Sequence, residues 1–368
     1  MQGVRLGLLF GGRSGEHEIS VLSARSVYRG ALEAGMQVVG AGITREGRWV
    51  YMGDCSAFMG GNHTEVLGDM GLECSILPDP SKQGIWVSGP QGLFKVDVDA
   101  VFPVLHGLYG EDGTVQGLLE LSGIPYVGAP PLSSAICMDK GTTKRLLQTH
   151  GVPHVPGFTV ERFAWHAQGD DVLKALSGLL TFPVFVKPSG SGSSLGVTKV
   201  KSMGAMPAAL DSAFVYDTRA LIEPSQEGLL EIECSVLGND EPVASLAGQI
   251  LPTREFYDYE AKYIDETTRY AIPASLPPEL MKRVQEVAIA AYKATCCRGM
   301  ARVDFFVDPK AGEAYVNELN TIPGFTSISM YPKLWEASGL PFPQLVRRLV
   351  DLAIQRQADE VREVRRVN

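Results

Sequence analysis

The chain has 368 residues, of which 45% are hydrophobic and 20% charged, a composition that excludes intrinsic disorder and fits a folded globular protein. At about 100–200 residues per domain, this length predicts two or three domains. The 33 basic and 42 acidic residues give a net charge of -9, so most of the surface should repel nucleic acid and anionic membranes.

The sequence predicts a cytoplasmic protein without membrane or nucleic-acid partners. The apolar stretches are far shorter than the ~20 residues of a membrane helix, and the N-terminus lacks a cleavable signal pattern. Six cysteines have neither C-x-x-C nor zinc-binding spacing. Their pattern fits reduced thiols better than a disulfide framework.

The first part of the chain predicts a parallel α/β layer. An apolar run over residues 4–10 ends at two glycines, as expected for a buried strand that enters a turn. A helix capped by Ser20 should follow it, and further strands are expected over residues 38–43 and 100–105. A βαβ series of this kind implies a parallel sheet, which we place within residues 1–128.

The rest of the chain predicts α+β units. Residues 129–223 should contain a helix over 134–150, strands over 182–187, 196–200 and 219–223, and helices around 170–180 and 204–214. Residues 224–368 should contain strands over 230–237, 244–250, 301–307 and 314–320, and helices over 278–295 and from 342 onward. Between them, residues 252–269 are polar and tyrosine-rich with weak periodicity, and a loop of that length is usually functional or disordered.

The strongest group of candidate site residues lies on the last predicted hairpin. In one antiparallel register Asp304 lies opposite Glu318 and Arg302 opposite Asn320, and the two-residue period of a strand places all four on one face. Facing carboxylates repel each other, so a cation is expected between them. Mg²⁺ fits because it prefers hard oxygen ligands and is usually shared with substrate phosphates. The alternative is a solvated sheet face on which Arg302 neutralises the acids.

A second group lies in residues 187–197, where Lys187 precedes a run of serines and glycines. The glycines allow backbone amides to approach a ligand, and serines such as Ser193 and Ser194 add short donors. The flanking strands favour a phosphate-binding loop, with a flexible surface loop as the alternative. It is not a Walker A loop, because G-x-x-x-x-G-K-[ST] does not occur.

Two further motifs follow strand ends. Residues 11–20 carry Glu16 near a helix start, where an acid can simply be a partner of the helix dipole. Their glycines lack the G-x-G-x-x-G spacing of a dinucleotide site. His106 follows another strand end, which is where open α/β sheets bind ligands.

Taken in chain order, these motifs resemble the D-alanine–D-alanine ligases. The similar segments are residues 11–20, 106–113, 137–140, 187–197, 231–238, 256–263, 299–304 and 317–327, and they span nearly the whole chain. The resemblance implies a three-domain ATP-grasp fold of α/β and α+β class. Its parts would be an N-terminal substrate-binding domain over residues 1–128, a central subdomain over 129–223, and a C-terminal subdomain over 224–368 that holds the metal site and a lid loop.

The resemblance also implies roles for individual residues. It assigns ATP binding to Lys140, Lys187, Ser194, Glu223 and Glu231, and the binding of two Mg²⁺ or Mn²⁺ ions to Asp304, Glu318 and Asn320. Glu16 would hold the ammonium of the first D-alanine in a network with Ser193 and Tyr263, and His106 would line the same subsite. Lys262 and Ser329 would receive the carboxylate of the second D-alanine. Arg302 and the Gly324 amide would hold the oxyanion.

The implied reaction is the ATP-dependent joining of two D-alanines through a D-alanyl phosphate, for peptidoglycan precursors, by a homodimer. Residues 252–269 would close as a lid that keeps water from the acyl phosphate. One alternative is a ligase that joins D-alanine to D-lactate or D-serine. Another is a dinucleotide-binding oxidoreductase, which leaves the acids of the hairpin and the lysine–glycine loop unexplained.

Overall fold

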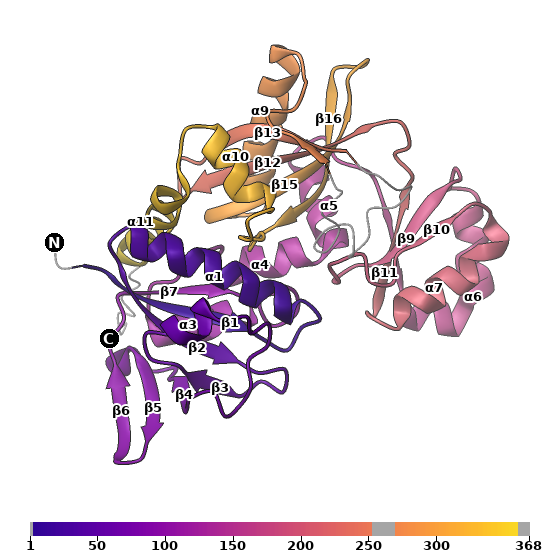
Figure 1. Cartoon of the computed structure of the whole chain (residues 1–368). Helices are drawn as coiled ribbons and strands as arrows, with labels where there is room; N and C mark the ends of the chain where they lie inside the picture. Colours follow the sequence, from indigo (N-terminus) through magenta and orange to yellow (C-terminus); the bar gives the residue numbers. More distant parts are fainter. Residues whose placement is uncertain (1–2, 252–268, 360–368) are drawn as a thin grey trace, which may run out of the picture.

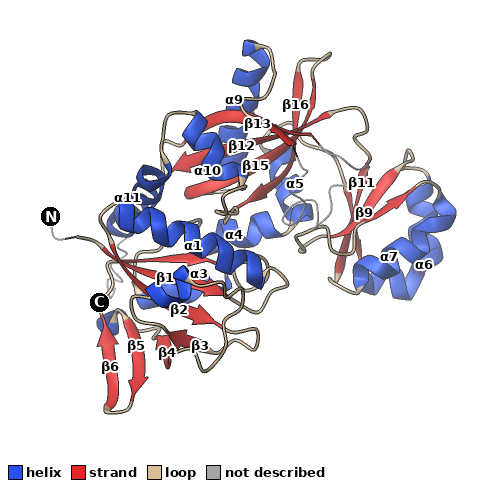
Figure 2. Cartoon of the chain, viewed as in Figure 1, coloured by secondary structure: helices blue, strands red, loops and turns tan. Residues whose placement is uncertain are grey.

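The structure is a computed structural model that describes residues 3–251 and 269–359. Three β-sheets, each covered by helices, follow one another along the chain (Figures 1 and 2). The predicted mixture of α/β and α+β units is confirmed. In the described residues no helix is long and apolar enough to cross a membrane.

The N-terminal sheet has seven strands in the order β6-β5-β4-β3-β2-β1-β7. Its strands are β1 (Arg5–Gly11), β2 (Gln37–Ile43), β3 (Trp49–Tyr51), β4 (Leu72–Ile76), β5 (Ile85–Gly89), β6 (Gly92–Val96) and β7 (Ala100–Val104). Only β1, β2 and β7 pair in parallel, whereas β3 to β6 form an antiparallel extension of the sheet that the sequence analysis missed. The connection from β5 to β6 is too short for the crossover that a parallel pair requires.

Helix α1 (His17–Glu33) begins four residues earlier than a cap at Ser20 predicts, so Ser20 is not its cap. The Ser20 hydroxyl is fully buried inside the helix. It donates to the carbonyl of Val104 and accepts from the Gly11 amide at 2.8 Å. Ser20 therefore joins α1 to the carboxyl ends of β1 and β7.

The central sheet has four strands in the order β10-β9-β11-β8. Its elements are β8 (Phe158–Glu161), α6 (Arg162–Ser177), β9 (Val184–Pro188), β10 (Thr198–Val200), a 3-10 turn η2 (Met203–Ala205), α7 (Met206–Phe214) and β11 (Arg219–Pro224). The three predicted strands are present, and β8 is an additional one. Val186, Leu210 and Ile222 lie in a separate hydrophobic core under this sheet.

The C-terminal sheet has the strand order β14-β13-β12-β15-β16. Its strands are β12 (Leu230–Gly238), β13 (Val243–Leu251), β14 (Arg269–Ala271), β15 (Gly299–Asp308) and β16 (Glu313–Asn320), and it packs against α9 (Pro278–Ala294) and α10 (Met330–Ala337). Leu147 and Val152, which follow the N-terminal sheet in sequence, lie in the same core as Val284 and Val303.

The single helix predicted over residues 134–150 is two helices, α4 (Pro131–Met138) and α5 (Lys140–Thr149). Asp139 separates the two helices because its backbone dihedral angles are extended. Its carboxylate accepts a hydrogen bond from the Thr142 amide at 2.7 Å and so caps the start of α5. Lys140 thereby becomes the first residue of α5. Its side chain is placed at a helix start rather than within a continuous helix.

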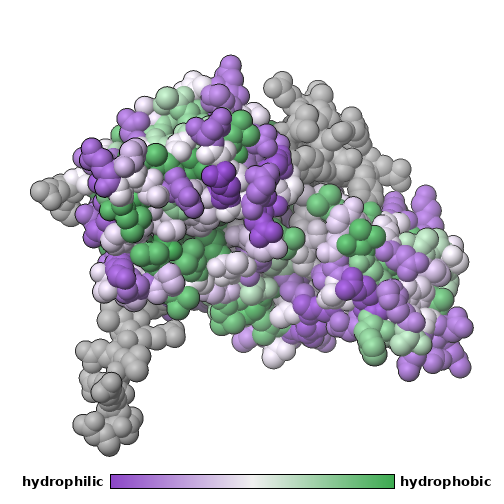
Figure 3. All heavy atoms as spheres, turned by 90° about the horizontal axis from the view of Figure 1, so that it is seen from below, coloured by the Kyte–Doolittle hydropathy of each residue, from purple (hydrophilic) through white to green (hydrophobic). Residues whose placement is uncertain are grey.

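The last described helix, α11 (Phe342–Asp359), returns to the N-terminal domain and lies along α1 (Figure 1). Its residues Leu345 and Val346 share a core with Val27 of α1. On the face seen in Figure 3, hydrophobic residues gather in patches separated by hydrophilic ones. The six cysteines are all free.

Candidate active site

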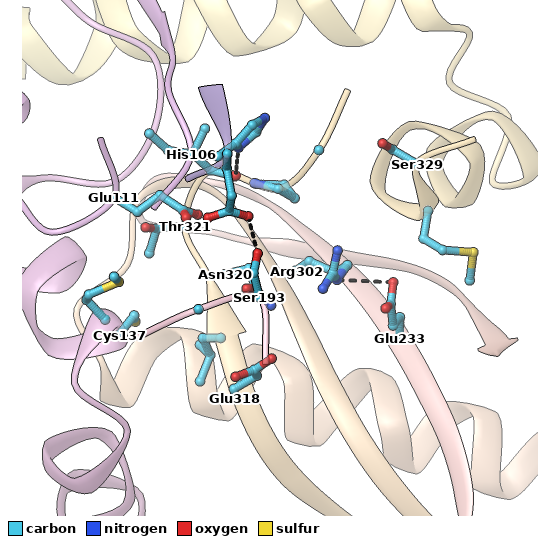
Figure 4. A pocket seen from close by; sticks show the side chains of 18 of the residues that line it. His106, Glu111, Cys137, Ser193, Glu233, Arg302, Glu318, Asn320, Thr321 and Ser329 are labelled. Carbon is cyan, nitrogen blue, oxygen red and sulfur yellow. Dashed lines mark hydrogen bonds and ion pairs between the residues drawn. The ribbon is translucent and has the colours of Figure 1, made fainter. Parts of the chain in front are cut away.

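Two cavities adjoin at a wall formed by α5, the loop after β9 and strand β16. The first has a volume of about 90 Å³ and is lined in part by Glu16 from the N-terminal domain. His106 from the N-terminal domain and Arg302 from β15 also line it (Figure 4). The second, of about 440 Å³, is lined by residues of the central and C-terminal sheets. Lys140, Gly192, Ser193 and Glu318 line both cavities. A ligand in one cavity would therefore meet a ligand in the other at these residues.

Each predicted site residue that the structure describes falls near these cavities. Glu16, His106, Lys140, Ser193, Arg302, Glu318, Asn320, Gly324 and Ser329 line the first, and Lys140, Lys187, Ser193, Ser194, Glu223, Glu231 and Glu318 line the second. Asp304 is bonded to Arg302 and Asn320 of the first cavity. Lys262 and Tyr263, with most of the predicted lid, lie outside the described residues.

The predicted register of the hairpin is confirmed at the site. Asp304 faces Glu318 and Arg302 faces Asn320. Arg302 donates from Nε and Nη2 to the two carboxylate oxygens of Asp304, each at 2.7 Å, and Asn320 Nδ2 donates to Asp304 Oδ2 at 3.0 Å. Beyond Asp304 the register shifts by one residue, which leaves Asn317 as an unpredicted bulge residue.

The donors on this face fit a divalent cation. Asp304, Glu318 and Asn320 supply two carboxylates and one carboxamide, all of them hard oxygen ligands, beside the wall between the cavities. Among the described residues there is no group of three or more His, Cys, Asp or Glu side chains with metal-binding geometry. A site of this kind is completed by water and substrate phosphates, which is the usual mode for Mg²⁺. Arg302 also neutralises Asp304 on this face. The ion pair of the alternative interpretation is therefore present beside the oxygen ligands that a metal site requires.

The loop after β9 has a defined conformation beside Lys140. Ser193 and Ser194 have φ values of +52° and +56°, a region that non-glycine residues rarely adopt and that is enriched at functional sites. Lys140 Nζ donates to the carbonyl of Ser191 at 2.7 Å and lies 3.4 Å from Glu318. The loop is thus held against the charged wall, which favours the phosphate-binding interpretation.

The predicted contact between Glu16 and Ser193 is present. Ser193 Oγ donates to Glu16 Oε1 at 2.6 Å, and this hydrogen bond joins the start of α1 to the loop after β9. Glu16 is only 9% exposed. An acid buried at the wall is suited to bind a small cationic group that enters the first cavity.

The family models decide the family of the chain. The model for the D-ala D-ala ligase N-terminus matches residues 5–129, and the model for the D-ala D-ala ligase C-terminus matches residues 146–351. The chain belongs to the D-alanine–D-alanine ligase family. A D-alanine–D-alanine ligase of Caldicellulosiruptor bescii is 47% identical over 357 residues, which are 97% of this chain and 96% of that protein. One of Chlorobium phaeovibrioides is 46% identical, over 96% of this chain and 98% of that protein.

Solved structures of this ligase family agree with the fold. The D-alanine–D-alanine ligase of Coxiella burnetii has a TM-score of 0.83 and 38% identity, and 97% of each chain is covered. The VanG D-Ala:D-Ser ligase of Enterococcus faecalis also has a TM-score of 0.83, with 36% identity over 96% of this chain and 100% of that one. The fold therefore identifies the ligase family but does not distinguish acceptors.

Glu111 is a residue of the ligase site that the sequence analysis did not single out, although it lies within the quoted 106–113 motif. It lines the first cavity near Glu16, and its Oε2 accepts the Gly107 amide at 2.7 Å. Loss of hydration, together with the nearby charge of Glu16, raises the pKa of Glu111 to about 8. At neutral pH the Glu111 carboxyl is therefore mostly protonated.

Replacing Glu111 by glutamine should make the stability of this ligase less dependent on pH. Because the pKa of Glu111 is raised in the folded state, its contribution is complete below the ordinary value of 4.5 and is lost as the pH rises toward about 8. Glutamine resembles the protonated acid and can still accept the Gly107 amide. We expect the thermal midpoint of Glu111→Gln to exceed that of the wild type at pH 8 but not at pH 5. A difference in thermal midpoint between the wild type and Glu111→Gln that is the same at all pH values would contradict the raised pKa of Glu111.

Glu223 sits in a buried ion triad beside the second cavity. Its oxygens lie 2.6 Å from Lys144 Nζ and 2.5 Å from Lys187 Nζ. Burial opposes ionisation of Glu223, but the two lysines outweigh it and lower the pKa of this carboxyl. Burial also lowers the pKa of Lys144, which the sequence analysis did not select. Glu223 thus has a structural role in addition to its predicted contact with the nucleotide.

Gly324 and Ser329 lie together between β16 and α10. A Cβ at Gly324 would come within 2.7 Å of Ser329 Oγ, so a larger residue there would require the Ser329 side chain to move. Ser329 Oγ accepts the Thr326 amide at 3.0 Å, and Ser329 is the N-cap residue that directly precedes α10. The positive end of that helix favours a carboxylate.

Proposed function

We propose that the chain catalyses the ATP-dependent ligation of two D-alanines, with release of ADP and phosphate. The observation that carries this proposal is the common wall of Lys140, Gly192, Ser193 and Glu318 between the two cavities. ATP in the larger cavity would direct its γ-phosphate to this wall, and an amino acid in the smaller cavity would present its carboxylate there. The family membership of the chain supports the same pair of substrates.

The first step forms D-alanyl phosphate. A carboxylate oxygen of the first D-alanine attacks the γ-phosphorus, and the bond to the ADP oxygen breaks. Lys140 and Lys187 neutralise the phosphate oxygens, while Glu16 orients the ammonium of the amino acid. Asp304, Glu318 and Asn320 would hold divalent cations, two of them in our proposal, which when bound neutralise charge on the transferring group.

The second step forms the peptide bond. The free amine of the second D-alanine attacks the acyl carbon and loses a proton, and the tetrahedral intermediate then expels phosphate. Arg302 and the Gly324 amide would stabilise the oxyanion, and Ser329 and Lys262 would receive the carboxylate of the attacking amino acid. We place this reaction in the cytoplasm, in the synthesis of peptidoglycan precursors.

Product analysis tests the proposal and its closest alternative. The purified chain would be incubated with ATP, Mg²⁺ and D-alanine, alone or with equal D-serine or D-lactate, and the products separated by mass. We expect D-alanyl-D-alanine as the main product in each mixture, with one ADP per dipeptide. A mixed product in excess would favour the alternative acceptor, as in the relative named a D-Ala:D-Ser ligase. ADP formation without any dipeptide or ester would contradict ligation altogether.

Replacing Glu16 by glutamine should weaken binding of the first D-alanine. The variant keeps an acceptor for Ser193 Oγ but removes the charge that would face the substrate ammonium. Loss of a charged hydrogen bond costs roughly 1.5–3 kcal/mol, so KM for the first D-alanine should rise about 10-fold to 100-fold while KM for ATP changes little. A selective rise at the second D-alanine site would contradict this placement.

A further inference from the structure

The loop from Ile322 to Phe325 connects β16 with α10 and carries Gly324, yet two side chains of the N-terminal domain hold it. Ser23 reaches it from α1, and His106 reaches it from the segment after β7. Both side chains are buried, with Ser23 fully inaccessible and His106 4% exposed. The amide assigned to the oxyanion thus lies between contacts made by another domain.

Three hydrogen bonds form a chain across this boundary. The Phe325 amide donates to Ser23 Oγ at 3.2 Å, Ser23 Oγ lies 3.0 Å from His106 Nε2, and His106 Nδ1 lies 3.0 Å from the Ile322 carbonyl. A carbonyl only accepts, so Nδ1 carries a proton. Burial lowers the pKa of His106, so the ring is neutral and Nε2 accepts from the Ser23 hydroxyl. Every donor in the chain then has an acceptor.

We propose that Ser23 and His106 are positioning residues that fix the Gly324 amide for the oxyanion of the peptide-forming step. This inference rests on the proposed function. The two anchors bind the carbonyl two residues before Gly324 and the amide directly after it. Loss of either anchor releases one end of a short segment in which the amide must be held within a fraction of an ångström.

The assignment predicts which chemical step suffers. Formation of D-alanyl phosphate uses the wall with Lys140 and Glu318, which neither anchor touches. The tetrahedral oxyanion arises only when the second D-alanine attacks. A loosened Gly324 amide should therefore slow peptide formation and leave acyl phosphate formation intact, so that more of the acyl phosphate is lost to water.

The test compares Ser23→Ala with Ser20→Ala. Ser20 is an equally buried serine on α1 whose hydroxyl also makes two hydrogen bonds, but to Gly11 and Val104 rather than to the Gly324 loop. The scrambling of ¹⁸O from the β–γ bridge of ATP measures the formation of acyl phosphate. The ratio of ADP to dipeptide measures how much of the acyl phosphate goes on to form the peptide bond. Ser23→Cys, whose thiol is a weaker donor and acceptor of similar size, provides a second variant if Ser23→Ala does not fold.

For Ser23→Ala we expect dipeptide formation to fall roughly 10-fold to 100-fold, with wild-type ¹⁸O scrambling and more than one ADP per dipeptide. Ser20→Ala should keep the wild-type ratio. The positioning role would be overturned if Ser23→Ala and Ser20→Ala had equal ratios of ADP to dipeptide. It would also be overturned if Ser23→Ala lost ¹⁸O scrambling and dipeptide formation to the same extent. Absence of both scrambling and dipeptide in the wild type would instead overturn the proposed function, so the two failures are distinguishable.

Discussion

Replacing Glu318 by glutamine should abolish ligation while the fold stays intact. Glu318 faces Asp304 across the hairpin, lies 3.4 Å from Lys140, and lines both cavities. The variant removes an anionic oxygen from the proposed metal site and changes the charge balance at the wall where phosphoryl transfer is placed. We expect dipeptide formation to fall by at least about 100-fold, the scale of losing one strong electrostatic contact to a transition state.

The measurement is dipeptide formation at saturating ATP and D-alanine over a series of Mg²⁺ concentrations, with circular dichroism to monitor the fold. Glu313→Gln is the matched control, because Glu313 lies on the same strand but opposite Asp308 and outside both cavities. Asp304→Asn should resemble Glu318→Gln, although it also weakens the Arg302 contact. Turnover near that of the wild type at ordinary Mg²⁺ in either variant would contradict the metal assignment.

The hairpin could be predicted because its two signals agree. Polar residues alternate with buried apolar ones, and a turn-rich connector fixes how the strands meet, so period and register together place four side chains on one face. The bulge at Asn317 could not be predicted in this way. An inserted residue shifts the register without disturbing the composition of either strand.

The element boundaries that were wrong have local physical causes. Asp139 ends one helix and caps the next, and a short polar cap inside an otherwise helical pattern is easily overlooked. The antiparallel strands β3 to β6 are short, and most residues of β6 are exposed. These strands therefore lack the continuous apolar run that identified β1. Ser20 has the residue type of a cap, but its hydroxyl bonds to strand ends that only the folded sheet brings near it.

Polar contacts between residues far apart in the sequence could not be predicted from sequence patterns. Glu223 and Lys144 lie in different secondary-structure elements, and no periodicity relates them. The same holds for Ser23 and His106, which the fold joins to each other and to the loop before α10. The resemblance to a family proposed the principal site residues, but only the folded structure shows the side chains that contact them.

Replacing Glu223 by glutamine should strongly destabilise the protein. The side chains of Glu223 and Lys144 are 4% and 5% exposed, and that of Lys187 is 12% exposed. The variant leaves two ammonium groups close together without the carboxylate that compensates them. Removing one partner of a buried ion pair costs about 3–5 kcal/mol, because the remaining charge is buried and unpaired. We expect a clear fall in the thermal midpoint and weaker binding of ATP in the adjoining cavity.

Two comparisons make this prediction specific to the triad. Glu227→Gln removes an exposed acid that pairs with Lys199, and it should shift stability by no more than about 0.5 kcal/mol. The double variant Glu223→Gln/Lys144→Met should regain part of the lost stability, because it removes one of the uncompensated charges together with the acid. Equal thermal midpoints for Glu223→Gln and Glu227→Gln would show that the triad contributes no more than a surface ion pair.

The pH dependence supplies an independent check. The folded state lowers the pKa of Glu223, so the stability it contributes is present above the ordinary value of 4.5 and is lost as the pH falls through the lowered one. The difference in thermal midpoint between the wild type and Glu223→Gln should therefore be large at pH 7 and shrink on acidification below about pH 4.5. A difference that stays constant down to the acid limit of the native state would mean that glutamine disturbs packing rather than charge.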